Sequence, residues 1–330
     1  MNIFRRRRKY AIGLLAQDPI DVRDYQLAEI QAPLGDAEMP IEYNLRNEMT
    51  PVGRQNWGTC TAWSACAVKE FWDSKEAQSI IDLSEKFVYH NTKKISGLWG
   101  MQGDMLSNAL KSICTYGAPE TKDYPDIKET SWEKYVKAEP SNDIYEKAKK
   151  YKGLTYWTVH KGLSEIKSAI YTNKCPVAIG MKWYPSFYKT GKDGRLPLPS
   201  GDAYGGHAVS CIGWTRDKLW FKNSWGTSFG DNGYFYVPVA DFSKYDIWNA
   251  KVLLDINTEG LEGWVANKYL ETKAYKTGTA VSPTTSLRLR SEATTNSDIV
   301  KTLPKGTKCR ILNDEVVAAN GYNWQKIKLL

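Results

Sequence analysis

The sequence lacks long hydrophobic runs, which excludes several kinds of protein at once. Among its 330 residues the longest mainly apolar stretches are 10–16 and 175–181, far below the ~18 residues that a membrane-spanning helix requires. We therefore expect no membrane insertion. The amino-terminal patch is also too short for a secretory signal. We expect synthesis in the cytoplasm without a signal peptide, and action in a virion or outside the cell after lysis.

Cysteine and histidine are scarce and are not grouped as metal ligands. The three histidines are widely separated, and the cysteines show no Cys-x-x-Cys pair and no zinc-type spacing, lying at positions 60, 66, 114, 175, 211 and 309. Such a wide spread in a long chain is typical of folding in a reducing compartment rather than of a disulfide framework. We expect no metal and no cofactor.

Positive charge is in modest excess, but it is not arranged for nucleic-acid binding. The chain has 45 Lys and Arg against 37 Asp and Glu, a net charge of +8, and five of the positive charges form one run at 5–9. A nucleic-acid-binding protein normally spreads basic side chains along one face. A single terminal run is usually a solvated tail, so nucleic acid is not an expected partner.

The pattern of apolar residues divides the chain into three parts. Residues 1–50 look extended and polar, and 1–40 are expected to form an N-terminal extension. Helices are expected first and strands afterwards, at 60–71, 84–94, 105–116 and 164–172, then at 177–181, 207–213, 218–222 and 233–237. This segregation predicts an α+β domain over 41–255, with a cleft between a helical half and a strand-rich half. The composition shifts at 255–260, and 256–330 is expected to form a small all-β domain.

Cys60 stands where a nucleophile can be activated. Thr59 precedes an apolar stripe at helical spacing, so we expect it to cap a helix that begins at Cys60. The positive end of a helix dipole lowers the pKa of a thiol. On its own this signal is weak, because a cysteine on an apolar helix is usually a small core residue, and Cys66 is interpreted in that way.

His207 and Asn223 supply the partners that such a nucleophile needs. His207 enters a predicted strand behind two glycines, whereas His90 and His160 are interpreted as structural. Separations of 147 residues from Cys60 to His207 and 163 residues to Asn223 fit a Cys-His-Asn triad assembled across a cleft. In such a triad the asparagine amide orients the imidazole.

Together these motifs resemble the papain-like cysteine peptidases, most closely their bacterial and phage branch. The likeness covers roughly residues 17–254 and rests on ordered motifs at 18–19, 23–25, 45–46, 58–60, 83–84, 109–110, 116–117, 186–187, 205–209 and 223–226. It implies a two-lobed fold in which Cys60 attacks the scissile carbonyl as a thiolate paired with protonated His207. Asn223 would hold the ring, and the indole of Trp225 would shield that hydrogen bond from water.

The resemblance also implies an oxyanion hole, and here the sequence departs from the family. In the family a glutamine lies six residues before the nucleophile, whereas Gln55 lies five before Cys60 and Arg54 lies six before it. We prefer a one-residue deletion that keeps Gln55 beside the oxyanion. The alternatives are that Arg54 takes its place or that activity is impaired.

The substrate is expected to be a protein or peptide that lies extended along Gly103 and Asp104, by analogy with the family. Asp104 replaces a glycine that is usual there. The remaining expected substrate-binding residues are Met105, Leu106, Ala208 and Trp225. The stretch before residue 40 is short for the family's inhibitory propeptide, so a conventional zymogen is not expected.

Residues 256–330 resemble bacterial SH3-like barrels, which often bind cell-wall peptide bridges. The resemblance rests on 286–291, 299–307 and 324–327. The Gly-Trp-Val and Tyr-Leu stretch that normally comes last occurs instead at 263–270. We therefore hypothesise a permuted barrel in which 262–270 supplies the final strand, the alternative being a linker that looks similar. A bacterial cell wall, or a partner in an assembly, is the expected ligand of 256–330.

The leading interpretation is a cysteine endopeptidase that carries an SH3-like domain. A first alternative is a lytic enzyme that cleaves the stem peptides of peptidoglycan. A second is a catalytically impaired structural or binding component of a phage particle. The Asn-Ser-Trp-Gly element at 223–226 favours the protein-cleaving enzyme over the first alternative, and the retention of all three triad residues favours it over the second.

Overall fold

The computed structural model describes residues 10–19, 26–29, 32–126, 131–254, 262–266, 269–270, 280–284, 287–290, 292–297, 299–303 and 309–329. The chain divides into two compact units, residues 1–255 and 256–330, and each is described by itself. The basic run at 5–9 and the predicted junction at 255–260 lie outside the described residues.

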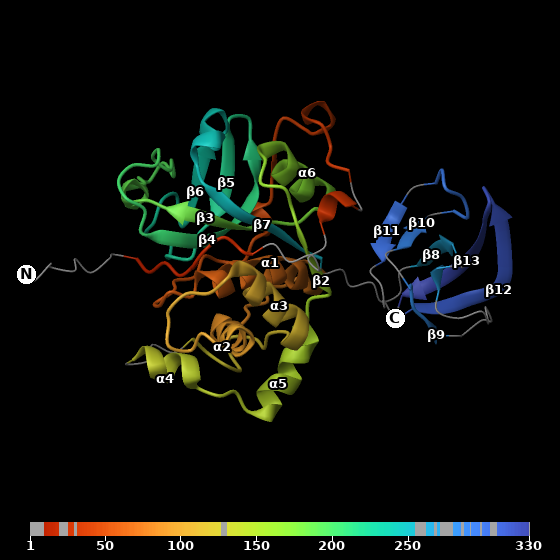
Figure 1. Ribbon diagram of the computed structural model, residues 1–330, viewed down its shortest axis with the longest axis horizontal. Helices are drawn as coiled ribbons and strands as arrows, with labels where there is room; N and C mark the ends of the chain where they lie inside the picture. The colour runs from red at the N-terminus through yellow and green to blue at the C-terminus, as the bar shows by residue number, and fades with distance from the viewer. Residues whose placement is uncertain are drawn as a thin grey trace, which may run out of the picture. The chain divides into compact units, whose positions relative to one another are not determined.

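The first unit contains a lobe built mainly of helices (Figure 1). These are α1 (Cys60–Ala77), α2 (Glu85–Ser96), α3 (Leu106–Tyr116), α4 (Trp132–Lys137) and α5 (Asn142–Ala148). Helix α2 shows why a segment begins and ends where it does. The Ser84 hydroxyl accepts the backbone N–H of Phe87 at 3.2 Å, and Gly97 takes the left-handed conformation that ends the helix, at φ 73°.

The second lobe is an antiparallel sheet. Its strands are β1 (Tyr43–Asn44), β2 (Thr155–Thr158), β3 (Val177–Trp183), β4 (Gly205–Thr215), β5 (Lys218–Lys222), β6 (Tyr234–Pro238) and β7 (Ile247–Leu254). They lie in the order β2-β7-β3-β4-β5-β6, and β1 pairs with β4. Helix α6 (Leu163–Asn173) packs against this sheet. The expected α+β fold, with a helical part and a strand-rich part, is confirmed.

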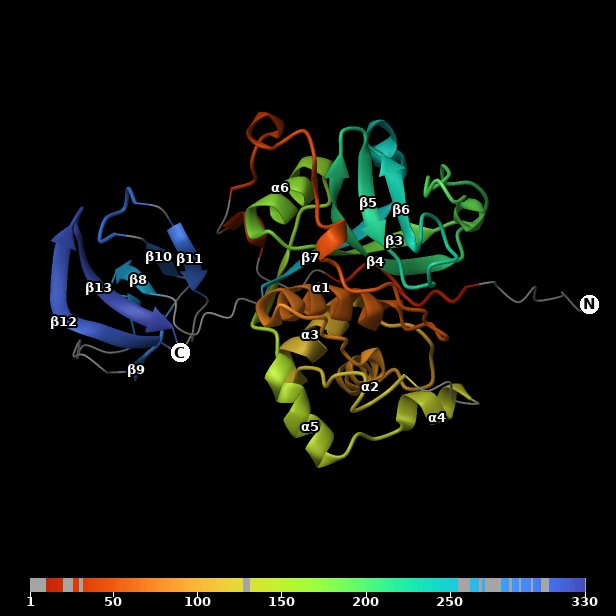
Figure 2. The same cartoon turned by 180° about the vertical axis from the view of Figure 1, so that it is seen from behind.

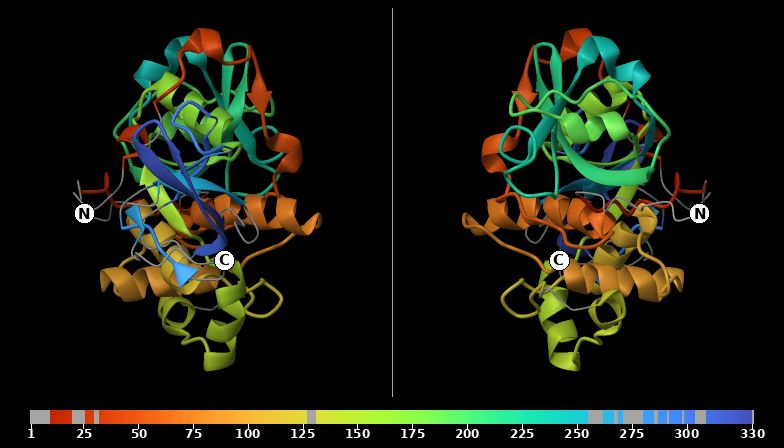
Figure 3. Two further views of the ribbon diagram at one scale, coloured as in Figure 1. Left: turned by 90° about the vertical axis from the view of Figure 1, so that its right-hand side faces the viewer. Right: turned by 90° about the vertical axis from the view of Figure 1, so that its left-hand side faces the viewer.

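Helix α1 joins the two lobes. In the two side views it lies between the sheet and the other helices of the first lobe (Figure 3). It contacts α2, α3 and β4, and the Ser64 hydroxyl donates to the backbone carbonyl of Val209 in β4 at 2.8 Å. The first turn of α1 therefore lies against β4.

Short 3₁₀ helices complete the first unit: Leu27–Glu29, Asp36–Glu38, Arg46–Glu48, Lys149–Tyr151, Pro185–Lys189 and Val239–Lys244. None of the six cysteines, all of which are described, is bonded to another. Among the described residues, no helix is both long and apolar enough to cross a bilayer.

The second unit is an antiparallel sheet of six strands. Figures 1 and 2 show it from opposite sides. The strands are β8 (Glu262–Ala266), β9 (Ala280–Val281), β10 (Leu287–Arg290), β11 (Ile299–Leu303), β12 (Cys309–Ala319) and β13 (Tyr322–Leu329), in the order β11-β10-β8-β13-β12-β9. Strand β8 pairs with β13, with Ala266 opposite Trp324 and Glu262 opposite Lys328. Asn320 and Gly321, at φ 51° and 77°, form the tight turn that joins β12 to β13.

Candidate active site

His207 and Asn223 form the centre of the site. His207 lies in β4, and its Nε2 atom is 2.8 Å from Oδ1 of Asn223, which follows β5. The same oxygen accepts the backbone N–H of Ser224 at 2.8 Å, so the carbonyl end of the amide faces the ring. Nε2 is therefore the donor in the neutral ring, and Nδ1, which makes no hydrogen bond, is the nitrogen left to accept a proton.

Two indoles enclose the imidazole. Trp225 stacks on His207 with the ring centres 4.4 Å apart and the planes 24° apart. Trp183 of β3 meets the ring edge-on, with the centres 4.8 Å apart. Both indoles and the imidazole are buried. Trp225 therefore covers the ring that bonds to Asn223.

Cys60 is the first residue of α1 and is completely buried. The backbone N–H of Ala208, the residue after His207, hydrogen-bonds to its sulfur, as does that of Gly13. The sulfur therefore lies beside the part of β4 that carries the imidazole. Thr59 occupies the N-cap position, but its side chain makes no capping hydrogen bond, so the expected hydroxyl cap is wrong.

Burial raises the pKa of the Cys60 thiol to about 11, although backbone hydrogen bonds from Ala208 and Gly13 oppose the shift. Burial likewise lowers the pKa of His207 to about 4, opposed only by the hydrogen bond with Asn223. The sequence predicted that the helix N-terminus would lower the thiol pKa. That expectation is wrong for this state of the site, because the desolvation of a buried thiolate outweighs the helix dipole. Sulfur and imidazole are both neutral here near pH 7.

Gln55 is buried beside Ser224, the residue after Asn223, while Arg54 is exposed. The Nε2 atom of Gln55 donates to the carbonyl oxygens of Trp57 at 2.8 Å and Ala11 at 3.0 Å. Its Oε1 atom accepts the hydroxyl of Ser224 at 2.5 Å. The side-chain amide is thus fixed in place and donates to a peptide carbonyl, that of Ala11. The indole N–H of Trp225 donates to the same Ala11 oxygen at 2.9 Å.

A stretch near the start of the chain fills the cleft between the lobes. We call residues 10–18 the cleft segment; it runs between α1 and β4 in Figure 1, drawn in red. Leu14 exchanges two backbone hydrogen bonds of 3.0 Å with Gly206 of β4. On the other side, Asp104 donates to Gly13 at 2.8 Å and accepts from Leu15 at 3.2 Å. No local pattern in residues 10–18 indicates this pairing, because Gly206 and Asp104 lie in distant parts of the chain.

The expected substrate-binding residues surround the cleft segment. The Gly103–Asp104 stretch and Gly206 supply backbone edges. Leu14 is buried in an apolar cluster that includes Cys60, Leu106 and Ala208. Met105 is half-buried and lies outside this cluster. It takes the N-cap position of α3, and its place in the pocket wall stays a prediction.

Asp104 is completely buried and holds this backbone edge from behind. Its carboxylate accepts the hydroxyl of Ser96 at 2.7 Å and the amide of Asn108 at 2.8 Å. The ammonium of Lys93, also fully buried, lies 3.1 Å away and donates to the carbonyl of Gly103. Burial lowers the pKa of Lys93, and Asp104 opposes that shift. This buried ion pair fixes the backbone edge with which Gly13 and Leu15 pair.

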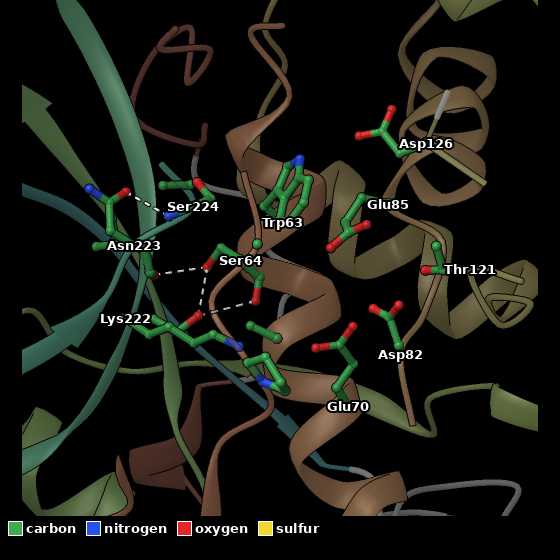
Figure 4. A pocket seen from close by; sticks show the side chains of 16 residues that line it. Trp63, Ser64, Glu70, Asp82, Glu85, Thr121, Asp126, Lys222, Asn223 and Ser224 are labelled. Carbon is green, nitrogen blue, oxygen red and sulfur yellow. Dashed lines mark hydrogen bonds between the residues drawn. The ribbon is translucent and has the colours of Figure 1, made fainter. Parts of the chain in front are cut away.

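A cavity of about 190 Å³ lies beside Asn223 and Ser224, between helical residues and residues of β4 and β5 (Figure 4). The carboxyl side chains of Glu70 and Glu85 face the Lys222 side of this cavity in the figure. Lys222 donates to the hydroxyl of Thr50 at 2.8 Å, and Thr50 donates to Glu70 at 2.6 Å. Burial raises the pKa of both Glu70 and Glu85. Within the described part of the chain, no three His, Cys, Asp or Glu side chains gather as metal ligands.

Comparison with known proteins adds three findings. Residues 39–252 match the family described as papain family cysteine protease. The cathepsin B-like cysteine proteinase 3 of Caenorhabditis elegans is 37% identical over 125 residues, which is 36% of this chain and 33% of that protein. An uncharacterized peptidase C1-like protein of Acanthamoeba polyphaga mimivirus is 26% identical over 233 residues, 64% of this chain and 72% of that protein. The chain thus matches about a third of the length of the first of these relatives.

Two solved structures share the fold. Xylellain, a cysteine protease from Xylella fastidiosa, has a TM-score of 0.66 at 24% identity, covering 78% of this chain and 100% of its own. A cysteine protease of Carica candamarcensis in complex with E-64 has a TM-score of 0.53 at 20% identity, covering 66% and 99% of the two chains. At these identities the likeness shows the fold alone.

Proposed function

Since the chain belongs to the papain family of cysteine proteases, we propose that it hydrolyses internal peptide bonds with Cys60, His207 and Asn223. The observation that carries the proposal is the bond from His207 to Asn223. In this bond Nε2 is the donor, and Nδ1 is left without a hydrogen bond. The next residue along β4, Ala208, has a backbone N–H that hydrogen-bonds to the sulfur of Cys60.

The chemistry follows from that arrangement. The thiol of Cys60 gives its proton to Nδ1 of His207, and the thiolate attacks the scissile carbonyl carbon to form a tetrahedral oxyanion. When the C–N bond breaks, His207 returns the proton to the leaving amine, and a thioester remains on Cys60. His207 then takes a proton from water, whose oxygen attacks the thioester and releases the acid and the thiol.

The oxyanion is bound by the backbone N–H of Cys60 and by the side-chain amide of Gln55. Gln55 supports this role because its Nε2 atom already binds the carbonyl oxygen of Ala11 in the cleft. Removing one such donor typically costs ~10²–10³ in rate. Arg54, the alternative, has an exposed side chain.

The substrate is an extended polypeptide with an apolar side chain in the position of Leu14. The cleft segment supports this, because an extended stretch of chain already pairs with Asp104 on one side and with Gly206 on the other. It also passes through the cleft without an end there, as the cleavage of an internal bond requires.

The test compares casein hydrolysis by the native chain, by the Gly13→Val variant and by each of these with Cys60→Ala. Gly13→Val is included because a Cβ atom there would lie 2.0 Å from the carbonyl oxygen of Gly58 and would displace the cleft segment. An epoxysuccinyl thiol inhibitor should form its adduct at Cys60, located by mass spectrometry. Hydrolysis that persists in both Cys60→Ala proteins, or adducts spread over several cysteines, would refute the proposal.

For residues 256–330 we propose a permuted SH3-like barrel that binds a bacterial cell wall or another surface. The pairing of β8 with β13 supports the permutation, because it puts 262–266 beside the strand that would otherwise have no neighbour on that side. Sedimentation of the full chain with purified cell walls tests the ligand, and protein that stays in solution would refute it. Loss of turbidity in a wall suspension, with casein intact, would instead favour cleavage of peptidoglycan stem peptides.

A further inference from the structure

We propose that this protease selects substrates with an aromatic residue directly after the scissile bond, and that the rings of Trp225, Tyr188 and Phe229 form the slot for it. The inference rests on the proposed function, since it concerns the substrate of the same site. It starts from Tyr10, whose buried ring stacks on Trp225 with the centres 4.7 Å apart and the planes 6° apart. The protein itself thus places an aromatic side chain in this slot.

The slot lies on the leaving-group side of the cleft. An indole has two faces, and His207 stacks on one face of Trp225 with the ring centres 4.4 Å apart. Tyr10, stacked at a similar distance, therefore lies on the other face. In the proposed reaction His207 gives its proton to the leaving amine, which belongs to the residue after the scissile bond. The side chain of that residue is therefore the one that can reach the position of Tyr10.

The backbone contacts next to Tyr10 agree with this placement. The carbonyl oxygen of Ala11, the following residue, accepts hydrogen bonds from Nε2 of Gln55 at 3.0 Å and from the indole N–H of Trp225 at 2.9 Å. Gln55 is the proposed oxyanion donor, so the Tyr10 ring lies one residue away from a carbonyl held at that donor. A substrate residue that adjoins the scissile carbonyl can put its own ring at the same place.

The walls of the slot are held by contacts other than those of Tyr10. Tyr188 lies nearly parallel to Trp225 with the ring centres 5.6 Å apart, and Trp183 meets it edge-on at 6.3 Å. Phe229 meets Trp225 edge-on at 5.0 Å and Tyr10 at 5.7 Å. Aromatic pairs prefer such offset-stacked and edge-on arrangements. A substrate ring would therefore stack on the indole and receive an edge contact from Phe229.

The charge beside the slot decides between an aromatic ring and a cation, both of which can stack on an indole. The ammonium of Lys192 donates to the carbonyl of Ser228 at 3.1 Å, directly before Phe229 in the chain. Arg54 forms a backbone bridge with Trp225. A lysine or arginine side chain in the slot would meet these like charges, whereas a neutral ring would not. Phenylalanine, tyrosine or tryptophan is therefore the expected occupant.

The experiment compares peptides that differ only in the residue after the scissile bond, which is phenylalanine, alanine or arginine. The kcat/KM of each is measured with the full chain carrying Gly13→Val, and again with Tyr10→Ala, which empties the slot itself. Both backgrounds are combined with Tyr188→Ala, or with Tyr188→Leu if the alanine variant does not fold. The matched control is Tyr184→Ala, because the ring of Tyr184 packs on Phe187, with the centres 5.5 Å apart.

We expect the phenylalanine peptide to exceed the other two at least about tenfold in kcat/KM. Tyr188→Ala should reduce this preference at least about threefold, and Tyr184→Ala should keep it. Similar rates for all three peptides, a faster arginine peptide, or a preference that survives Tyr188→Ala would refute the slot while the peptidase stands.

Binding separates the slot from the chemistry. Calorimetry measures the affinity of the same peptides for each background with Cys60→Ala. If the phenylalanine peptide binds at least about tenfold more tightly than the others but no peptide is cleaved by the chain that retains Cys60, the slot is supported and the proposed function fails. Equal affinities for the three peptides would refute the slot.

Discussion

Mild acid should release the cleft segment, because burial in the closed cleft weakens proton binding by His207 and opening the cleft restores it. Burial lowers its pKa from 6.5 to about 4, and no charged group contributes to the shift. The neighbours that enclose the ring, Trp183, Trp225 and Asn223, are uncharged. Once the cleft opens to water, the pKa should return toward its ordinary value. The open state then binds more protons than the closed state between the two pKa values, so lowering the pH through that window favours opening.

The size of the effect follows from the two pKa values. Near pH 7 both states leave the ring neutral. Near pH 5 an open ring with the ordinary pKa is mostly protonated, whereas the closed ring is mostly neutral. The ratio of open to closed protein should therefore rise roughly 20-fold between about pH 7 and pH 5, equivalent to ~1.8 kcal/mol.

Hydrogen exchange read by mass spectrometry measures this ratio directly, through the backbone amides of the cleft segment. Leu14 and Leu15 donate hydrogen bonds to residues of the two lobes, so their protection, corrected for the intrinsic rate at each pH, reports the closed fraction. Helix α3 should keep its protection. In His207→Gln the pH dependence should disappear. Unchanged protection of residues 10–18 near pH 5, or an equal loss in His207→Gln, would show that the imidazole is not the group responsible.

Three further predictions concern the site itself. In the Gly13→Val background, Asn223→Ala should lower kcat by about 10²-fold with little change in KM, because the ring loses the partner that orients it. Steady-state kinetics with a peptide substrate measures this, and an unchanged kcat would contradict it. Gln55→Ala in the same background should lower kcat by ~10²–10³, and an equal loss in Arg54→Ala would show that the wrong donor has been assigned. Lys93→Met should reduce the free energy of unfolding by about 3–5 kcal/mol, because Asp104 is left as an unpaired buried charge. Urea denaturation of Lys93→Met, with and without Asp104→Asn, measures the loss. The double variant should recover part of it.

The parts of the fold that sequence predicts are those with a regular apolar period. Helices α1, α2, α3 and α6 and strands β3 to β6 show such a period, and each was predicted within a few residues of its observed bounds, apart from the longer α1. Strand β7 was missed, because Asn249 and Lys251 interrupt its apolar pattern. Both side chains are nevertheless buried, since Asp18, from a distant part of the chain, lies against them. A local pattern contains no record of such a partner.

The same limit decides what the sequence can say about the site. Spacing and residue type predicted which side chains to bring together, and His207 does meet Asn223. The protonation of Cys60 depends on a different fact, namely whether residues 10–18 lie over it. A helix N-terminus lowers the pKa of an exposed thiol, but a covered one loses more through desolvation than the dipole returns. The reactivity of Cys60 therefore depends on whether the cleft is covered by residues 10–18 or open.

The pH profile of Cys60 alkylation should differ between these two states. In native protein the rate should keep rising toward the thiol pKa of about 11, whereas in Gly13→Val it should level off at a lower pH; superimposable profiles would mean that the cleft segment does not set the state of the thiol.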